Sequence, residues 1–348
     1  MFLQELGWND FFAKQLSEGV PARVASAIRE QFLVWTDAGE IEASAGGRLR
    51  HSTSKWEWPC VGDWLVLRHN TPVIERVLQR KTKLSRKRPG KQVREQVLAA
   101  NIDVLFIVSG LDRDYNPRRI ERYLVLAREG GTRPVILLNK MDLADELQLD
   151  LDGILNETRL LAPDVRVLPV SAVSGNSLDA LSGFLSAGET AAMIGSSGAG
   201  KSTILNRLLR AELQRTQSVR SGDSRGRHTT SRRELFHMPG GWLLMDLPGL
   251  RELQPWANVE HLDYSFDDIQ HLAQSCHFRD CSHMSEPGCA VQNAAIDPRR
   301  LANYQKLQRE LAYLDRKSDP RVAREEQQRW KTIEKSLRAS ARWQKKNR

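Results

Sequence analysis

The octapeptide GSSGAGKS at residues 195–202 is the feature that most constrains the fold of this chain. It has the spacing of a phosphate-binding loop, whose glycines let backbone N–H groups approach phosphate oxygens. The apolar residues AAMI precede it and a helix-forming stretch follows, which is the strand, loop and helix context that such a loop requires. In this interpretation Lys201 reaches the β- and γ-phosphates and the Ser202 hydroxyl ligates Mg²⁺. The loop alone indicates a nucleoside triphosphate; the alternative is a Gly/Ser turn that starts a helix.

A second motif, NKMD at residues 139–142, follows the apolar run PVILL and indicates the base. Asp142 can accept hydrogen bonds from guanine N1–H and the exocyclic amino group, which adenine cannot match. The stem of Lys140 can lie over the ring, and Asn139 can link neighbouring loops. Ser171 and Ala172 follow the next apolar run, where a backbone N–H can meet guanine O6. The alternative for NKMD is a helix N-terminus capped by Asp142.

The tetrapeptide DLPG at residues 246–249 ends the apolar run WLLMD and indicates the magnesium side of the site. Asp246 can reach Mg²⁺ through water, and the N–H of Gly249 can contact the γ-phosphate. The polar and basic stretch at residues 218–235 lacks periodicity and predicts a mobile first switch. Thr229 or Thr230 can supply a second hydroxyl to Mg²⁺, and we favour Thr230. The alternative is an ordinary solvated loop.

Position 250 bears on hydrolysis, because many small GTPases carry a water-orienting Gln there and this chain has Leu250. Leucine cannot orient a water molecule, so another group is needed. The candidate in the switch stretch is His228, which we predict to be catalytic together with Lys201; the alternative is a solvent-facing loop histidine. We expect slow intrinsic turnover that a partner accelerates by ordering the switches.

The order of these motifs is unusual for a GTPase, because base recognition precedes the phosphate loop in the chain. This order predicts a circularly permuted GTPase domain, which is tolerable because the termini of compact α/β domains often lie close together. The second switch then leads directly into a cysteine-rich segment. The residues expected to bind GTP are Asn139, Lys140, Met141, Asp142, Ser171, Ala172, Gly195, Ser196, Ser197, Gly198, Ala199, Gly200, Lys201, Ser202, Thr203, Asp246 and Gly249.

Three regions differ in their hydrophobic patterns. Short, β-branched or aromatic runs between residues 20 and 75 predict an all-β barrel of the OB type. From residue 101 to about 250, the buried runs VLFIV, PVILL, VRVLPV, AMIG and WLLMD alternate with helical stretches, which predicts a mainly parallel α/β sheet. The remainder reads as helical. We therefore predict three domains: a barrel at residues 1–85, the GTPase domain at 86–255 and a helical metal-binding domain with a basic tail at 256–348.

Three of the four cysteines lie close together in the last region. Cys276, Cys281, His283 and Cys289 form a Cys-x4-Cys-x-His-x5-Cys pattern, and four such ligands predict one closed, structural Zn²⁺ site. His277 is an alternative ligand, although its adjacency to Cys276 makes ligation by both awkward. The other interpretation is three buried cysteines and a surface histidine.

Positive charge is concentrated in two blocks. The net charge of the chain is +9, but residues 76–94 carry +9 and residues 299–348 carry +10, whereas the rest is mildly acidic. Such blocks favour a polyanionic partner, nucleic acid before membrane, and residues 76–94 are expected to form a linker or loop that becomes ordered on binding. The barrel region adds aromatic and basic side chains that could contact RNA: Trp35, Arg48, Arg50, Lys55, Trp56, Trp58 and Trp64. Of these, Trp35 and Trp64 are expected in the core, and Trp56 and Trp58 on the surface.

The succession NKMD, SA, GSSGAGKST, GRHTT, DLPG and the Cys/His cluster, after a small β-domain, resembles the bacterial small-subunit-dependent GTPase A family (RsgA, also called YjeQ). This resemblance covers nearly the whole chain. It implies an OB-fold domain, a circularly permuted GTPase domain and a zinc domain. It also implies late maturation of the 30S ribosomal subunit, binding to 16S rRNA and activation by that subunit. Ser231 stands where the family often has a third threonine, which leaves the magnesium-ligating hydroxyl open.

We therefore predict a GTP hydrolase that binds GTP or GDP with Mg²⁺, the 30S subunit and its 16S rRNA. The alternative is a non-enzymatic RNA-binding regulator that uses nucleotide only as a conformational ligand; a metal-delivery GTPase is disfavoured because a closed Cys₃His site would release metal poorly. No run of eighteen apolar residues occurs, and the N-terminus lacks a signal-peptide pattern. We expect a cytoplasmic monomer without a membrane partner.

Overall fold

A computed structural model describes residues 2–28, 30–52, 58–87, 95–217, 233–247, 259–279 and 281–318. The chain divides into two compact units, the first formed by Met1–Arg86 and Glu95–Ala257 and the second by Lys87–Arg94 and Asn258–Arg348. The first unit contains both a β-barrel and an α/β sheet, and the second is helical. The domain boundaries proposed from the sequence stay predictions.

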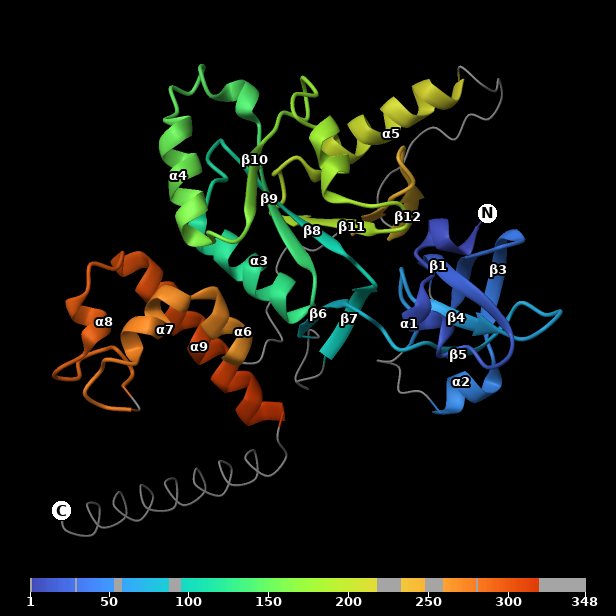
Figure 1. Cartoon of the computed structure of the whole chain (residues 1–348), viewed down its shortest axis with the longest axis horizontal. Coiled ribbons are helices and arrows are strands. Elements are labelled where there is room, and N and C mark those ends of the chain that lie inside the picture. The colour runs from blue at the N-terminus through green and yellow to red at the C-terminus, as the bar shows by residue number, and fades with distance from the viewer. Residues whose placement is uncertain are drawn as a thin grey trace, which may run out of the picture. The chain divides into compact units, whose positions relative to one another are not determined.

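The first five strands of the chain form a closed barrel. They are β1 (Val20–Ile28), β2 (Gln31–Thr36), β3 (Gly39–Ala45), β4 (Trp64–Leu67) and β5 (Val73–Val77). They pair in the order β1-β2-β3-β5-β4, and β4 pairs back onto β1 (Figure 1). Inward-facing residues such as Val24, Phe32 and Leu65 fill the interior. A short helix, α2 (Gly47–Ser52), separates β3 from β4 in the chain. The predicted all-β barrel is confirmed.

The middle of the chain forms a second, mainly parallel arrangement in the order β10-β9-β8-β11-β13-β12. These strands are β8 (Val104–Gly110), β9 (Arg133–Asn139), β10 (Arg166–Pro169), β11 (Thr190–Gly195), β12 (Glu234–His237) and β13 (Leu243–Asp246). The first five in this order run parallel, and β12 pairs antiparallel with β13. Each buried run predicted from the sequence is therefore a parallel strand, whereas β12 was not predicted.

Helices cover both faces of this sheet because successive strand residues point to opposite sides. The main ones are α3 (Pro117–Glu129), α4 (Leu151–Leu161) and α5 (Lys201–Gln217). Leu105 and Ile107 of β8 belong to the core that also contains α3 and α4 residues. Val104 and Phe106 of the same strand belong to the core that contains α5 residues. The continuous apolar runs of the sequence thus reflect burial on both sides.

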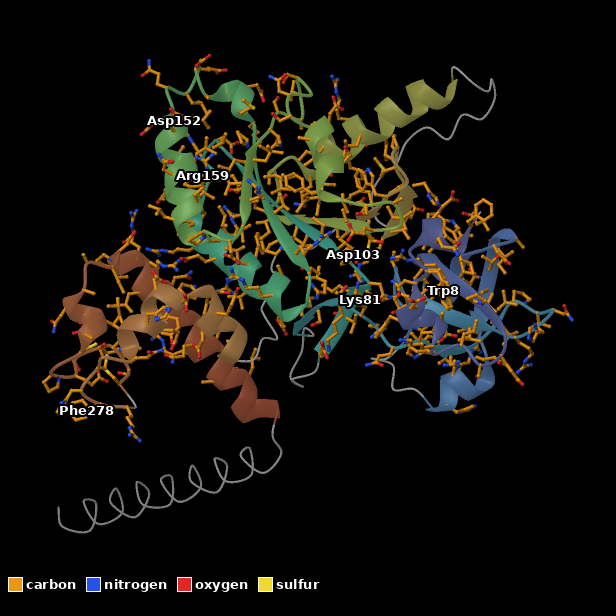
Figure 2. All side chains as sticks on the ribbon, viewed as in Figure 1. Trp8, Lys81, Asp103, Asp152, Arg159 and Phe278 are labelled. Atoms are coloured by element: carbon orange, nitrogen blue, oxygen red, sulfur yellow. The ribbon has the colours of Figure 1, made fainter. Side chains whose placement is uncertain are left out.

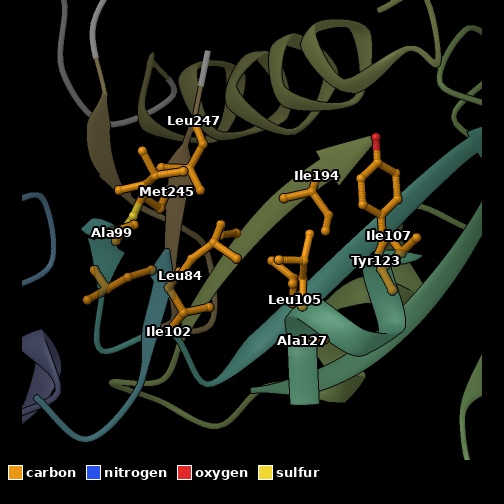
Figure 3. Packing of buried hydrophobic residues seen from close by; sticks show 14 of the residues in the cluster. Leu84, Ala99, Ile102, Leu105, Ile107, Tyr123, Ala127, Ile194, Met245 and Leu247 are labelled. Atoms are coloured by element: carbon orange, nitrogen blue, oxygen red, sulfur yellow. The ribbon is translucent and has the colours of Figure 1, made fainter. Parts of the chain in front are cut away.

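A two-stranded ribbon, β6 (Lys83–Lys87) with β7 (Glu95–Ala100), extends the core under α3. Figure 3 shows Leu84 of the ribbon in the same cluster as Tyr123 of α3 and Met245 of β13. The expectation of a loop throughout residues 76–94 was therefore wrong for residues 76 and 77, which end β5, and for Lys83–Lys87. Leu78 and Leu84 are both buried in the core, and a count of charges takes no account of these two apolar residues. Residues 88–94 lie outside the described residues.

Inside the first unit, strand β1 joins the barrel to the sheet. Ser26 of β1 pairs with Glu234 of β12. The Trp35 ring of the barrel stacks on His237 of β12, with 4.7 Å between ring centroids. The two arrangements therefore share one continuous hydrogen-bonded sheet.

A buried arginine strengthens this junction. Arg23 of β1 is 1% exposed and donates hydrogen bonds to the Leu6 carbonyl, to the Asn101 carbonyl at 3.1 Å and to Thr190 Oγ1 at 2.7 Å. Burial lowers the pKa of this guanidinium to about 10. Arg23 lines a cleft together with Trp8, Lys81 and Asp103, among others. Figure 2 labels the last three of these residues. Because Thr190 begins β11, Arg23 connects the barrel to the strand that precedes the phosphate loop.

The second unit is a small helical assembly with its own core. Its helices are α6 (Val259–Ser265), α7 (Asp267–Ala273), α8 (Ala290–Asn293) and α9 (Pro298–Ser318). Phe266 is fully buried against Tyr304 of α9, and the Arg300 guanidinium lies 4.8 Å from the centroid of the Phe266 ring. Arg300 also pairs with Asp268 at 2.7 Å. None of the helices in the described ranges combines the length and apolar character needed to span a bilayer.

Candidate nucleotide site and metal centre

The predicted nucleotide motifs meet at one edge of the sheet. Strand β9 ends at Asn139, β11 ends at Gly195, β13 ends at Asp246, and Ser171 follows β10. These are carboxyl ends of parallel strands, and open α/β sheets bind ligands outside such ends. The fold therefore brings together motifs that lie far apart in the chain.

Glycines shape the phosphate loop between β11 and α5. Gly198 and Gly200 have φ angles of 89° and 97°, in the left-handed region that favours glycine. A Cβ atom on Gly200 would lie 2.1 Å from Nδ2 of Asn139. The glycine at position 200 is thus required both by its backbone angle and by the close approach of the base loop.

Lys201 is the first residue of α5, and its ammonium lies within the loop. Its Nζ donates to the carbonyl oxygens of Gly195 at 2.8 Å and Ser196 at 2.6 Å. Burial lowers the pKa of Lys201, and the negative charges of Asp114 and Asp246 oppose that shift. Phosphate oxygens beside this ammonium would favour its charged form further.

Asn139 connects three loops that follow three different strands. The side chain is 1% exposed. Its Nδ2 donates to the Ala199 carbonyl of the phosphate loop at 2.8 Å, and its Oδ1 accepts from the Ala172 N–H at 3.0 Å. The N–H of Met141 donates to the Val170 carbonyl at 3.1 Å, which adds a backbone link to the same neighbour. The relative positions of the base loop and the phosphate loop are set by these bonds.

The two charged residues of NKMD are both oriented by neighbours. The Ser171 hydroxyl donates to Asp142 Oδ1 at 2.5 Å and accepts from the Ser174 N–H at 3.1 Å. Asp142 itself is exposed, so its carboxylate is accessible to a base. Lys140 has a φ of 70°, and its Nζ lies 2.5 Å from Oδ2 of Asp112. Asp142 therefore presents an oriented acceptor at the open edge of the site.

The described residues that were expected to bind magnesium lie at the start of α5 and at the end of β13. Ser202 and Thr203 are exposed in the first turn of α5. Asp246 ends β13, which pairs with β11, the strand before the phosphate loop. The charge of Asp246 acts on Lys201. The described part of the site thus has two hydroxyls at the start of α5 and one carboxylate at the end of β13, and both kinds of group are suitable ligands for Mg²⁺.

Several residues considered for the switches lie outside the described residues. They are His228, Thr229, Thr230, Gly249 and Leu250. Their roles stay predictions.

The sequence analysis missed the loop between β8 and α3. Its Asp112 pairs with Lys140, and its Asp114 accepts a hydrogen bond from the Ser196 hydroxyl and pairs with Arg119 at 2.9 Å. Neither aspartate belongs to a recognised motif. The available signal was their position directly after a buried parallel strand, at the edge where the other motifs also end.

The cysteine cluster of the second unit is assembled between α7 and α8. The ligand atoms of Cys276, Cys281, His283 and Cys289 all lie within 4.8 Å of one another. The Sγ atoms of Cys276 and Cys289 are 3.9 Å apart, and His283 Nδ1 lies 3.6 Å and 3.5 Å from these two sulfurs. The four residues can hold a metal ion.

The distances among Cys276, His283 and Cys289 fit those of a tetrahedral site with the dimensions of zinc. Zn–S bonds of about 2.3 Å and Zn–N bonds of about 2.0 Å place sulfurs about 3.8 Å apart and sulfur and nitrogen about 3.5 Å apart. His283 is held through its backbone carbonyl, which accepts from Gln292 at 3.1 Å and Gln305 at 2.7 Å. His277 is not part of the cluster found among the described residues; its ring contacts Phe278.

Among the tryptophans considered for RNA contact, the described ones meet the expectation for the core, but Trp58 packs partly against the barrel core instead of lying on the surface. Trp64 is fully buried and Trp35 is 8% exposed, which confirms that both belong to the core. Trp58 is half-buried. Trp56 lies outside the described residues, so the surface expectation for it stays a prediction.

Some of the positive charges in residues 76–94 are neutralised by carboxylates inside the fold. Arg80 makes a two-pronged contact to Asp63, with both N–O distances at 2.7 Å, and the Asp63 side chain is fully buried. Lys83 pairs with Glu95 at 2.6 Å. The charge available to a partner from residues 76–94 is therefore smaller than the sequence total.

The fold and the site together define a P-loop GTPase with a circularly permuted chain, because the strands that carry base recognition precede the strand that carries the phosphate loop. The model of the RsgA GTPase family matches residues 77–256. The chain belongs to the RsgA GTPase family. An ABC transporter model also matches residues 178–345, a shorter stretch that includes the phosphate loop but not NKMD.

Similar proteins extend the match to nearly the full chain. A small ribosomal subunit biogenesis GTPase RsgA of Opitutus terrae is 44% identical and covers 98% of each chain. Small ribosomal subunit biogenesis GTPase RsgA 1 of Listeria innocua is 40% identical and covers 97% of each chain.

Two crystal structures have a similar fold. YjeQ from Thermotoga maritima has a TM-score of 0.60 and 26% identity, covering 84% of this chain and 98% of that one. YloQ, described as a circularly permuted GTPase, has a TM-score of 0.59 and 22% identity, covering 85% of this chain and 96% of that one. The fold of most of the chain is thus shared with known structures.

Proposed function

We propose that this chain binds and hydrolyses GTP and assists biogenesis of the small ribosomal subunit. The observation that carries the nucleotide assignment is Asn139, which links the phosphate loop to both base-side loops while Asp142 stays exposed beside it. The partner assignment is supported by relatives of 40–44% identity that are named for small ribosomal subunit biogenesis. In this proposal the 30S subunit and its 16S rRNA stimulate turnover, and hydrolysis releases the protein.

The site residues act as follows in this proposal. Asp142 accepts from guanine N1–H and the 2-amino group, the Lys140 stem covers the ring, and a backbone N–H of the loop after β10 meets O6. The backbone of residues 195–203 holds the phosphates, with Lys201 neutralising the β- and γ-oxygens. Bound Mg²⁺ supplies further charge neutralisation there. Its protein ligands are the hydroxyls of Ser202 and Thr230, with Asp246 reaching it through water and Gly249 donating to the γ-phosphate.

The decisive experiment measures GTP turnover with and without purified 30S subunits. We expect slow hydrolysis by the protein alone and strong stimulation by the subunit. The control is Lys201→Ala, which should abolish both rates because it removes the positive charge beside the oxygens of the β- and γ-phosphates. Binding of GTP without stimulated turnover would instead support a nucleotide-gated regulator.

We propose that His228 is the catalytic residue that orients the attacking water. Another residue is needed for this role because Leu250 stands where many small GTPases carry a glutamine, and leucine cannot orient water. His228→Ala should lower subunit-stimulated turnover while leaving GDP affinity close to that of the wild type. His277→Ala is the matched control, since that histidine belongs to the other unit. Unchanged stimulated hydrolysis in His228→Ala would exclude the catalytic role.

We propose that the metal of the Cys₃His cluster is one structural Zn²⁺. The support is the agreement between the observed sulfur–sulfur and sulfur–nitrogen distances and those of a tetrahedral site. Metal analysis after exhaustive dialysis should find one zinc per chain, and His283→Ala should lose it while His277→Ala retains it. A fully folded, zinc-free protein would contradict this assignment.

The basic segments are the proposed RNA contacts. Neutralising Lys345, Lys346 and Arg348 should weaken binding to 30S subunits and flatten its dependence on salt, because fewer counterions are released from the RNA. GTP affinity should stay nearly unchanged. A loss of GTP affinity would place the tail in the nucleotide domain's own fold instead. Sedimentation of the free protein should give a monomer.

A further inference from the structure

We propose that Asp112 and Asp114, here called the acidic pair, are positioning residues for the nucleotide: Asp112 orients Lys140 of the base loop and Asp114 orients Ser196 of the phosphate loop. The inference rests on the proposed guanine-nucleotide site and adds to it, because neither aspartate belongs to a nucleotide motif of the sequence. Both come from one loop, residues 110–116, between β8 and α3.

The order of the strands explains why this loop can act on both sides. Strand β8 lies between β9, which leads into the base loop, and β11, which leads into the phosphate loop. All three strands are parallel, so their carboxyl ends lie side by side at the same edge. The loop after the middle strand therefore lies between the two loops that hold the nucleotide.

Asp112 acts on the base side through an ion pair. Its Oδ2 lies 2.5 Å from Nζ of Lys140, and the two side chains are 30% and 26% exposed. Burial alone would raise the pKa of Asp112, but the hydrogen bond and charge of Lys140 lower it overall. The Lys140 stem is thereby held at both ends, by its backbone and by its ammonium. A held stem can cover a purine ring at a smaller entropic cost than a free one.

Asp114 acts on the phosphate side through a hydrogen bond. The Ser196 hydroxyl donates to Asp114 Oδ2, and Arg119 pairs with Asp114 Oδ1 at 2.9 Å. Ser196 is 8% exposed, and its carbonyl accepts from Lys201 Nζ at 2.6 Å. Asp114, Ser196 and Lys201 therefore form one chain of contacts that ends at the ammonium expected to meet the phosphates.

The acidic pair is rigid because its loop is anchored at several points. The Asp114 N–H donates to Asp112 Oδ1 at 3.1 Å, so the two aspartates fix each other. The Leu111 N–H donates to the Asn139 carbonyl at 2.7 Å. The Tyr115 hydroxyl donates to Glu157 Oε2 at 2.8 Å. A loop held in this way can transmit its geometry to both of its neighbours.

Carboxylates rather than amides are needed at these positions. Both oxygens of Asp112 accept, one from Lys140 and one from the Asp114 N–H, and both oxygens of Asp114 are likewise engaged. An asparagine offers one oxygen acceptor, so at position 112 it must break one contact and place an N–H against a donor. At position 114 it removes the charge that pairs with Arg119 and forces the Ser196 hydroxyl to accept rather than donate. Asp→Asn substitutions therefore test the inference with almost no change in side-chain volume.

The experiment compares equilibrium binding of GDP and inorganic tripolyphosphate, which lacks the base, to the full chain. Asp112→Asn should weaken GDP binding about threefold to fivefold, as for a partly exposed ion pair, and leave tripolyphosphate binding unchanged. Asp114→Asn should weaken both about tenfold or more. Asp145→Asn, an exposed aspartate three residues after Asp142, is the matched charge control and should change neither.

A coupling measurement separates positioning from damage to the fold. If Asp114 acts through Ser196, the losses in Asp114→Asn and Ser196→Ala should not add in the double variant. At saturating GTP, Asp112→Asn should retain the wild-type kcat while its KM rises. A general fold defect would lower the thermal midpoint and both ligand affinities together in Asp112→Asn, and this would overturn the inference.

Three other results would also overturn the inference. Tighter tripolyphosphate binding by Asp114→Asn would mean that the carboxylate only repels phosphate, and it would overturn the positioning role. Wild-type affinity in both Asp→Asn variants would overturn the inference while leaving the proposed function intact. Failure of the wild-type protein to bind GDP would remove the nucleotide site itself and both proposals with it.

Discussion

Asn139→Ala tests the geometry of the site most directly, because one buried side chain joins its three loops. The substitution removes the donor to the Ala199 carbonyl and the acceptor from the Ala172 N–H. Each backbone group left without a partner in the interior costs about 1–3 kcal/mol. We expect the free energy of unfolding to fall by about 2 kcal/mol or more. GDP affinity should fall about tenfold to a hundredfold, since the loops must also be reordered on binding.

The assay is calorimetric titration with GDP, paired with urea unfolding of the nucleotide-free protein. Asn156→Ala is the matched control, because Asn156 is an exposed asparagine on α4. It should bind and unfold like the wild type. Less than a threefold loss of GDP affinity in Asn139→Ala, with an unchanged unfolding midpoint, would refute the reasoning that this side chain sets the relative positions of the loops.

Three further predictions concern Asp142, His237 and the ion pair between Asp63 and Arg80. Asp142→Asn should lower kcat/KM for GTP about a hundredfold and improve it for XTP, because an amide can donate to the extra carbonyl of xanthine; equal loss for both nucleotides would argue against base reading by Asp142. Burial lowers the pKa of His237 below its ordinary 6.5. The free energy of unfolding is therefore highest above pH 6.5 and falls as the pH decreases toward the pKa of the folded state, because the unfolded chain binds the proton first. Between pH 7.5 and pH 5.5, urea unfolding should show a larger decrease in this free energy for the wild type than for His237→Phe. Asp63→Ala leaves half-buried Arg80 without its carboxylate partner and the buried Cys60 N–H without its acceptor, and it should cost about 3 kcal/mol in urea unfolding, with part recovered in the double variant Asp63→Ala/Arg80→Leu.

Those parts of the site that have a local pattern could be predicted from the sequence. The phosphate loop combines a glycine spacing with a preceding strand and a following helix, and NKMD and DLPG each end a buried run. The parallel order of those runs then follows from the alternation with helices. For the same reason the cysteine cluster was predictable, since its four ligands lie within fourteen residues, from Cys276 to Cys289.

The acidic pair could not be predicted in the same way. Asp112 and Asp114 are ordinary loop residues by composition, and their importance arises only from the position of β8 between β9 and β11. Spatial order in a permuted sheet is a property of the whole domain rather than of any short window. The basic stretch shows the same limit, because the burial of Leu84 and the Arg80–Asp63 pair depend on residues distant in the chain.

The point at which the barrel is attached to the sheet determines which side of the nucleotide site an RNA contact on the barrel would affect first. The barrel meets the sheet at the phosphate side: β1 pairs with β12, and Arg23 binds Thr190 at the start of β11. Strand β12 directly follows the segment predicted to be the first switch, and β11 leads into the phosphate loop. The base side, with β9 and β10, lies at the other end of the strand order. A force on the barrel would therefore act first on the phosphate-binding elements and would reach the base side only through Asn139 and the loop after β8. This order suits a partner that controls turnover rather than nucleotide choice.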